Sequence, residues 1–137
     1  MNSLDTATPF RAPAGSVPGD LARNETASLI AASKVNGTNV YNRQSESIGA
    51  IYDVMIDKAS GRVAFAIMSF GGFLGLGENY HPLPWSLLRY DAREGGYVVD
   101  LSRDRLEGGP SYAMNSPPNW SDAAYGREID SYYGIGP

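Results

Sequence analysis

The feature that most constrains the fold is a pair of apolar, β-branched and aromatic runs within residues 48–70. They flank residues 58–61, a short connection ending in glycine, which predicts a β-hairpin. On the first arm, one parity is mostly apolar and the other carries Asp53 and Asp57, as a half-buried strand requires. Ile51 breaks this alternation, which indicates a β-bulge nearby.

The second arm of the hairpin is apolar on both faces, so both faces need cover. We expect a barrel to cover one face, and the C-terminal tail, a loop or a second copy of the chain to cover the other. Hairpin parity assigns six side chains to the barrel core. They are Tyr52, Val54, Ile56, Phe65, Ile67 and Val98.

Shorter patterns place further strands around the hairpin. Residues 29–32 and 39–41 are each apolar enough to form a short strand, and residues 88–91 are expected to pair with residues 97–100. Residues 78–85 predict an extended edge segment, because its two prolines cannot donate hydrogen bonds to a neighbouring strand.

Two helices are expected after the strands. Ser102 is placed to cap a short helix over residues 103–107, which the following glycines would end. A tail helix over about residues 122–133, with Ser121 as a candidate N-cap, carries an apolar stripe. Its members are Tyr125, Ile129, Tyr132 and Tyr133. A helix this short is marginal by itself, so we expect it to form only when docked.

Length and composition restrict the remaining possibilities. A chain of 137 residues has room for one core, preceded here by a leader over residues 1–27 that we expect to be disordered. The predicted domain then covers residues 28–111 and the C-terminal extension residues 112–137. The net charge of −4 argues against nucleic acid as a partner, and no apolar run is long enough to span a membrane. The chain as given is expected to be cytoplasmic.

Several stretches taken together resemble the PRC-barrel family. They are residues 37–41, 48–57, 61–67, 80–88 and 97–100, which occur in the expected order. The resemblance implies a mainly β fold, a small antiparallel PRC-type β-barrel, here with a short helix and a C-terminal helical tail. Relatives occur in the photosynthetic reaction centre H subunit and in a ribosome maturation factor, where the barrel contacts other macromolecules. This chain most resembles the stand-alone bacterial members, and a docking module is implied.

No motif for catalysis, a cofactor or a metal emerges from the sequence. His81 is the one histidine and there is no cysteine, so a common zinc set cannot be completed. The glycine-rich residues 71–77 lack the lysine and hydroxyl residue of a phosphate-binding loop. Asp53 and Asp57 share a parity, but carboxylates beside a turn or bulge more often accept backbone N–H bonds. We expect no enzyme activity, no cofactor and no bound metal.

The leading hypothesis is a protein-interaction or self-assembling module whose partner the sequence does not identify. A homodimer is one way to cover the apolar surface. The candidate interaction surface comprises Ala66, Met68, Phe70, Phe73, Leu74, Leu76, Tyr125, Ile129, Tyr132 and Tyr133. The alternatives are a small-molecule-binding barrel and, less favoured, an enzyme of a type that leaves no sequence motif.

Overall fold

The computed structural model describes residues 25–70 and 79–135, which fall into two units divided after Val35. In the first unit, the Thr26 hydroxyl accepts a hydrogen bond from the Leu29 amide at 2.9 Å and bends the chain. An isolated bridge joins Glu25 to Ile30, and helix α2 (Ala32–Val35) follows. The strand predicted over residues 29–32 is therefore wrong. Most of the predicted leader lies outside the described residues.

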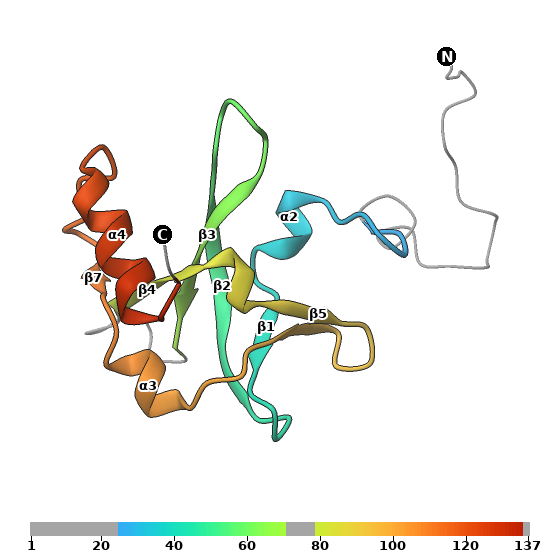
Figure 1. Ribbon diagram of the computed structural model, residues 1–137. Helices are drawn as coiled ribbons and strands as arrows, with labels where there is room; N and C mark the ends of the chain where they lie inside the picture. The colour runs from blue at the N-terminus through green and yellow to red at the C-terminus, as the bar shows by residue number, and fades with distance from the viewer. Residues whose placement is uncertain (1–24, 71–78, 136–137) are drawn as a thin grey trace, which may run out of the picture. The chain divides into compact units, whose positions relative to one another are not determined.

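The second unit is built on one seven-stranded sheet, shown in Figure 1, with the order β5-β6-β1-β2-β3-β4-β7. Its strands are β1 (Asn39–Tyr41), β2 (Ser47–Ile56), β3 (Val63–Ser69), β4 (Asn79–Pro84), β5 (Arg89–Asp91), β6 (Gly96–Val98) and β7 (Tyr112–Ala113). The predicted mainly β class is confirmed. Two details differ: β1 pairs with β6 in parallel, and no pairing between described strands joins β5 to β7 to close a barrel.

A β-bulge in β2 decides which side chains face which way. Ile51 pairs with Met68 and Asp53 with Ile67, so Tyr52 is an extra residue and the predicted bulge is confirmed. Beyond it, Val54 pairs with Ala66, on the side of Ile51. The prediction that Tyr52 and Val54 share a core face is therefore wrong, because one inserted residue reverses the alternation.

Burial shows the consequence for the predicted core. Ile67 is buried as expected, but Tyr52 and Ile56 are 50% and 48% exposed, and Ile56 ends β2 in the part of the hairpin that projects from the sheet in Figure 1. Val54, Phe65 and Val98 are half-buried. The largest fully buried side chains are instead Ile51, Ile67, Met68, Leu83, Leu106, Ile129, Val40 and Val99, with Pro82.

Both faces of β3 are covered, as its composition requires. Ala66 and Met68 pair with Leu83 and His81 of β4, and all four are buried. On the opposite face, Ile67 pairs with Pro82, also buried. Beyond Tyr80, β4 has no described strand on its other side. The prolines are tolerated at this edge because their missing N–H groups leave no ladder bond unmade.

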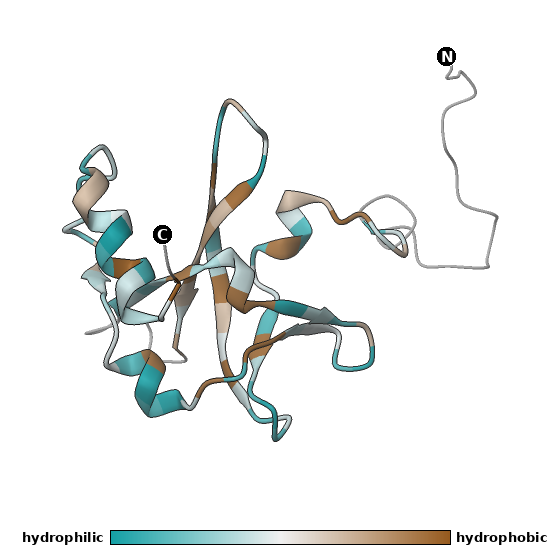
Figure 2. Cartoon of the chain, in the orientation of Figure 1, coloured by the Kyte–Doolittle hydropathy of each residue, from teal (hydrophilic) through white to brown (hydrophobic). Residues whose placement is uncertain are grey.

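The predicted helices are present, together with a short 3-10 helix η1 (Trp85–Leu87). Ser102 caps α3 (Arg103–Glu107) by accepting a hydrogen bond from the Arg105 amide at 3.0 Å. Figure 2 shows α3 as largely hydrophilic with a short hydrophobic stretch, and its Leu106 is fully buried.

Helix α4 (Ala123–Tyr132) is capped by Asp122 rather than by the predicted Ser121. The Asp122 carboxylate accepts a hydrogen bond from the Ala124 amide at 2.9 Å. At its other end, Gly134 adopts φ +73° while Ile135 N–H donates to Asp130 C=O at 2.8 Å. This is a Schellman ending, which needs a residue that tolerates the left-handed conformation.

The β2–β3 pairing depends on glycine at position 49. A Cβ on Gly49 would lie 2.5 Å from the Ser69 carbonyl oxygen and 3.3 Å from Met68 Cγ. We expect Gly49→Ala to lower the free energy of unfolding by roughly 1–3 kcal/mol, because backbone atoms cannot yield as a flexible side chain can. Urea denaturation monitored by fluorescence measures this change.

Gly126→Ala is the matched control. A Cβ there would lie 3.6 Å from the Phe65 ring, an ordinary contact, and alanine is favoured over glycine in a helix by about 0.8–1.0 kcal/mol. The control variant should be more stable than the parent protein. Equal effects of the two substitutions would contradict the close approach at Gly49.

Candidate functional site

Helix α4 packs on β4 and reaches the neighbouring β3 (Figure 1). The ring of Phe65 contacts the helix at Gly126, where the missing side chain lets the two elements approach. Ile129, a member of the apolar stripe that predicted this helix, is completely buried. The tail therefore covers part of the sheet within a single chain.

Aromatic rings form two chains of contacts on this side of the sheet. Tyr52 stacks on Tyr80 with ring centroids 4.3 Å apart, and Tyr80 lies 5.7 Å from Tyr112. Trp120 contacts both Phe65, at 5.8 Å, and Tyr125, at 5.2 Å. We call the six residues Tyr52, Phe65, Tyr80, Tyr112, Trp120 and Tyr125 the aromatic band.

The rings of the aromatic band differ in burial. Burial, with the nearby Tyr112 and Glu128, raises the pKa of Tyr125 to about 12, and its buried hydroxyl has no hydrogen-bond partner among the described residues. The pKa of Tyr112 is also raised, chiefly by burial. Tyr80 is 5% exposed, whereas half of Tyr52 remains open to solvent. The exposed end of the band is therefore Tyr52.

The residues predicted to form an interaction surface are now divided among several environments. Ala66, Met68 and Ile129 are completely buried, so they belong to the core of this chain. Phe70 is 8% exposed; its ring makes a T-shaped contact with the His81 ring, and the guanidinium of Arg103 lies over it. Phe73, Leu74 and Leu76 lie outside the described residues.

The other predicted tail residues join the two helices. Tyr132 donates its hydroxyl to the Arg105 carbonyl at 2.7 Å, while the Arg105 guanidinium donates to the Tyr132 carbonyl and lies over its ring. Tyr133 is buried against Gly109, and burial raises its pKa to about 12. These contacts make α3 and α4 one packed pair.

Sequence reasoning missed Tyr52 as a surface residue, because parity placed it in the core. It also missed Trp120, which has no helical or strand periodicity around it, and Tyr112, which lies in a two-residue strand. The run of aromatic residues in the C-terminal extension was the available signal for such a surface.

The two aspartates serve local structure, as the sequence indicated. The Asp57 carboxylate accepts hydrogen bonds from the amides of Ala59 and Ser60, both at 2.9 Å, and these bonds lower its pKa. The Asp53 carboxylate accepts a hydrogen bond from the next amide, Val54, at 2.8 Å. Their carboxylates are thus engaged with the turn and the bulge.

His81 is buried in the core face of β4, and its Nδ1 has no hydrogen-bond partner among the described residues. Loss of solvent lowers its pKa, outweighing the Leu106 backbone and Glu107, which favour the protonated form.

Nowhere in residues 25–70 and 79–135 do three His, Asp or Glu side chains gather as metal ligands would. None of the described helices could span a bilayer.

Comparison with protein families identifies the domain to which this part of the chain corresponds. The PRC-barrel domain matches residues 28–106, more than half of the chain. The matched region ends within α3, so β7 and α4 follow it and contribute Tyr112, Trp120 and Tyr125 to the aromatic band. No curated protein matches the chain.

The burial of His81 predicts a pH dependence of stability. Because its pKa in the folded protein is below the ordinary value of 6.5, the unfolded chain binds a proton at a higher pH than the folded chain. This contribution to stability is complete above pH 6.5 and declines as the pH falls below it. Urea denaturation between pH 7.5 and 5.5 should show the decline, and His81→Gln should flatten it. An equal slope in both proteins would contradict this assignment.

The buried stripe of α4 predicts that the tail stabilises the sheet. Truncating Ile129, which is completely buried, to alanine should lower the free energy of unfolding by roughly 2–5 kcal/mol. Arg127→Ala on the exposed face of the same helix should change it by less than about 0.5 kcal/mol. Thermal denaturation of both variants checks this, and similar melting temperatures would show that the helix is not docked.

Proposed function

Because this chain belongs to the PRC-barrel family, we propose that it is a non-catalytic protein-interaction module, and that it contacts its partner through the exposed end of the aromatic band. The observation that carries this proposal is Tyr52, a half-exposed ring stacked on the buried ring of Tyr80. The resemblance to docking barrels agrees with this role.

The physical properties of Tyr52 suit a contact residue. Tyrosine combines a large apolar ring with a polar hydroxyl, and it is enriched at the centres of protein interfaces. The stack on Tyr80 holds the ring in place before binding, so little side-chain freedom remains to be lost. Stacked pairs contribute about 0.5–1.5 kcal/mol beyond their buried area, which favours this fixed orientation.

The proposal is preferred to a small-molecule-binding barrel because large side chains fill the core. Val40, Ile51, Met68, Leu83 and Val99 are each at most 1% exposed. Such an interior resembles the packed cores of small barrels more than a ligand cavity. The engagement of Asp53 and Asp57 with backbone amides likewise favours the non-catalytic proposal over an enzyme.

Site-specific photo-crosslinking tests the proposed surface. A photoreactive phenylalanine analogue placed at Tyr52 of the full chain should form adducts in the cells that produce it. The same analogue at Tyr90 is a matched control, since Tyr90 is another tyrosine, 38% exposed, on β5. We expect a discrete adduct from position 52 and none from position 90.

The mass of the adduct distinguishes the kinds of partner. Twice the mass of the chain identifies a second copy, and light scattering of the purified protein should then show a dimer that Tyr52→Asp dissociates. A different mass identifies another protein, which should fail to bind purified Tyr52→Asp. Absence of an adduct at position 52, or equal labelling at both positions, would refute the proposed surface.

A further inference from the structure

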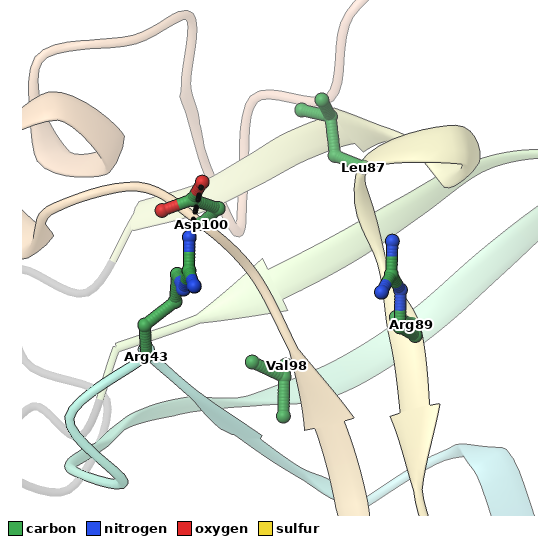
Figure 3. Close-up of a pocket in the computed structure, with 5 residues that line it drawn as sticks. All are labelled: Arg43, Leu87, Arg89, Val98 and Asp100. Atoms are coloured by element: carbon green, nitrogen blue, oxygen red, sulfur yellow. Dashed lines mark hydrogen bonds and ion pairs between the residues drawn. The ribbon is translucent and has the colours of Figure 1, made fainter.

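The sheet carries a pocket of about 240 Å³ at the β5–β6–β1 end, lined by Arg43, Leu87, Arg89, Val98 and Asp100. Figure 3 shows the two arginine side chains on opposite sides of Val98. Arg89 of β5 pairs with Val98 of β6, and Val98 lies beside Tyr41 of β1 in the parallel pair. Strand pairing thus brings together residues far apart in the sequence.

The two arginines differ in their partners. Arg43 donates to the Asp100 carboxylate at 3.3 Å, and both side chains are largely exposed. The Arg89 side chain has no hydrogen bond or ion pair with any described residue. Its guanidinium therefore keeps all its donors available to a ligand, in the fork geometry that matches a carboxylate.

The carboxylates of Glu46, Glu94 and Asp91 do not line the pocket, and each accepts a hydrogen bond from another residue. The Glu46 carboxylate accepts a hydrogen bond from the Asn42 side chain at 2.6 Å, and Glu94 accepts one from the Ser45 hydroxyl. Asp91 accepts a bond from the Arg93 amide at 2.8 Å within its own turn. The charged side chains lining the pocket, two arginines and one aspartate, leave it with a net charge of +1.

We propose that this pocket binds a monoanionic aliphatic carboxylate, with Arg89 as the main recognition group. The carboxylate would form paired hydrogen bonds with Arg89, and its alkyl group would contact Leu87 and Val98. One negative charge balances the pocket, whereas a phosphate dianion would leave a charge uncompensated. The shared chemistry fits both a free branched-chain acid and the carboxyl terminus of a peptide ending in leucine. This proposal is independent of the aromatic band.

Backbone amide chemical shifts of the 15N-labelled full chain provide the test. Titration with 3-methylbutanoate should shift amides around Arg89 and Val98 with a dissociation constant on the order of millimolar, as expected for an open pocket. The neutral 3-methylbutanamide has nearly the same shape and should not shift them. A peptide ending in a free leucine carboxylate is titrated in the same way, with its amidated form as the control. Comparing its dissociation constant with that of 3-methylbutanoate shows whether the peptide terminus or the free acid binds more tightly.

Three variants test the assignment of roles. Arg89→Gln should weaken binding by about tenfold or more, as loss of a charged, paired hydrogen bond predicts. Arg93→Gln, in the adjacent turn and outside the pocket, should leave it unchanged. Asp100→Asn removes the carboxylate that pairs with Arg43, so it should tighten binding of 3-methylbutanoate. It should also allow inorganic phosphate to compete with 3-methylbutanoate for the pocket. Equal shifts from acid and amide, or undiminished binding by Arg89→Gln, would overturn the proposal.

Discussion

Strand β3 has no polar face, and this constraint organises the second unit. On one face, Ala66 and Met68 are completely buried, as is Leu83 of the neighbouring β4. The other meets α4, where Phe65 fits against Gly126 and Trp120. A strand buried on both sides cannot be stable in an isolated hairpin, so the helix beyond the matched domain is part of the same folded unit.

Helices α3 and α4 stabilise each other while they cover the sheet. Helix α3 has only five residues, and a helix of that length is not stable alone. Its Leu106 is fully buried, and reciprocal hydrogen bonds between Arg105 and Tyr132 join it to α4. Each helix therefore depends on the other, and the aromatic band depends on both through the position of Trp120 and Tyr125.

Local chemistry in the sequence predicted most of the elements but not their faces. The turn at Asp57, the cap at Ser102 and the stripe through Ile129 are short-range signals, and all three lead to the predicted elements. The single extra residue Tyr52 was enough to exchange the inward and outward sides of β2. Parity can suggest that a bulge exists, but locating it requires the partner strand.

Features that depend on distant pairing were not predictable from local patterns. The parallel contact of β1 with β6 and the two-residue β7 have no periodicity of their own. The convergence of Arg43 and Arg89 follows from that parallel contact, so the pocket could not be inferred from either residue's neighbours. The sequence correctly predicted that the aromatic tail forms a helix. Ile129, which was predicted to lie on the interaction surface, is instead part of the core.

The order of elements along the chain has a consequence for synthesis of the protein. Helix α4 follows every strand that it covers, so during translation β3 and β4 leave the ribosome before their cover exists. Until residues 120–129 emerge, Phe65 and strand β4 lack the packing found in the finished fold. The nascent chain therefore passes through a stage with an exposed apolar sheet, during which chaperones would have a binding surface that the mature protein hides.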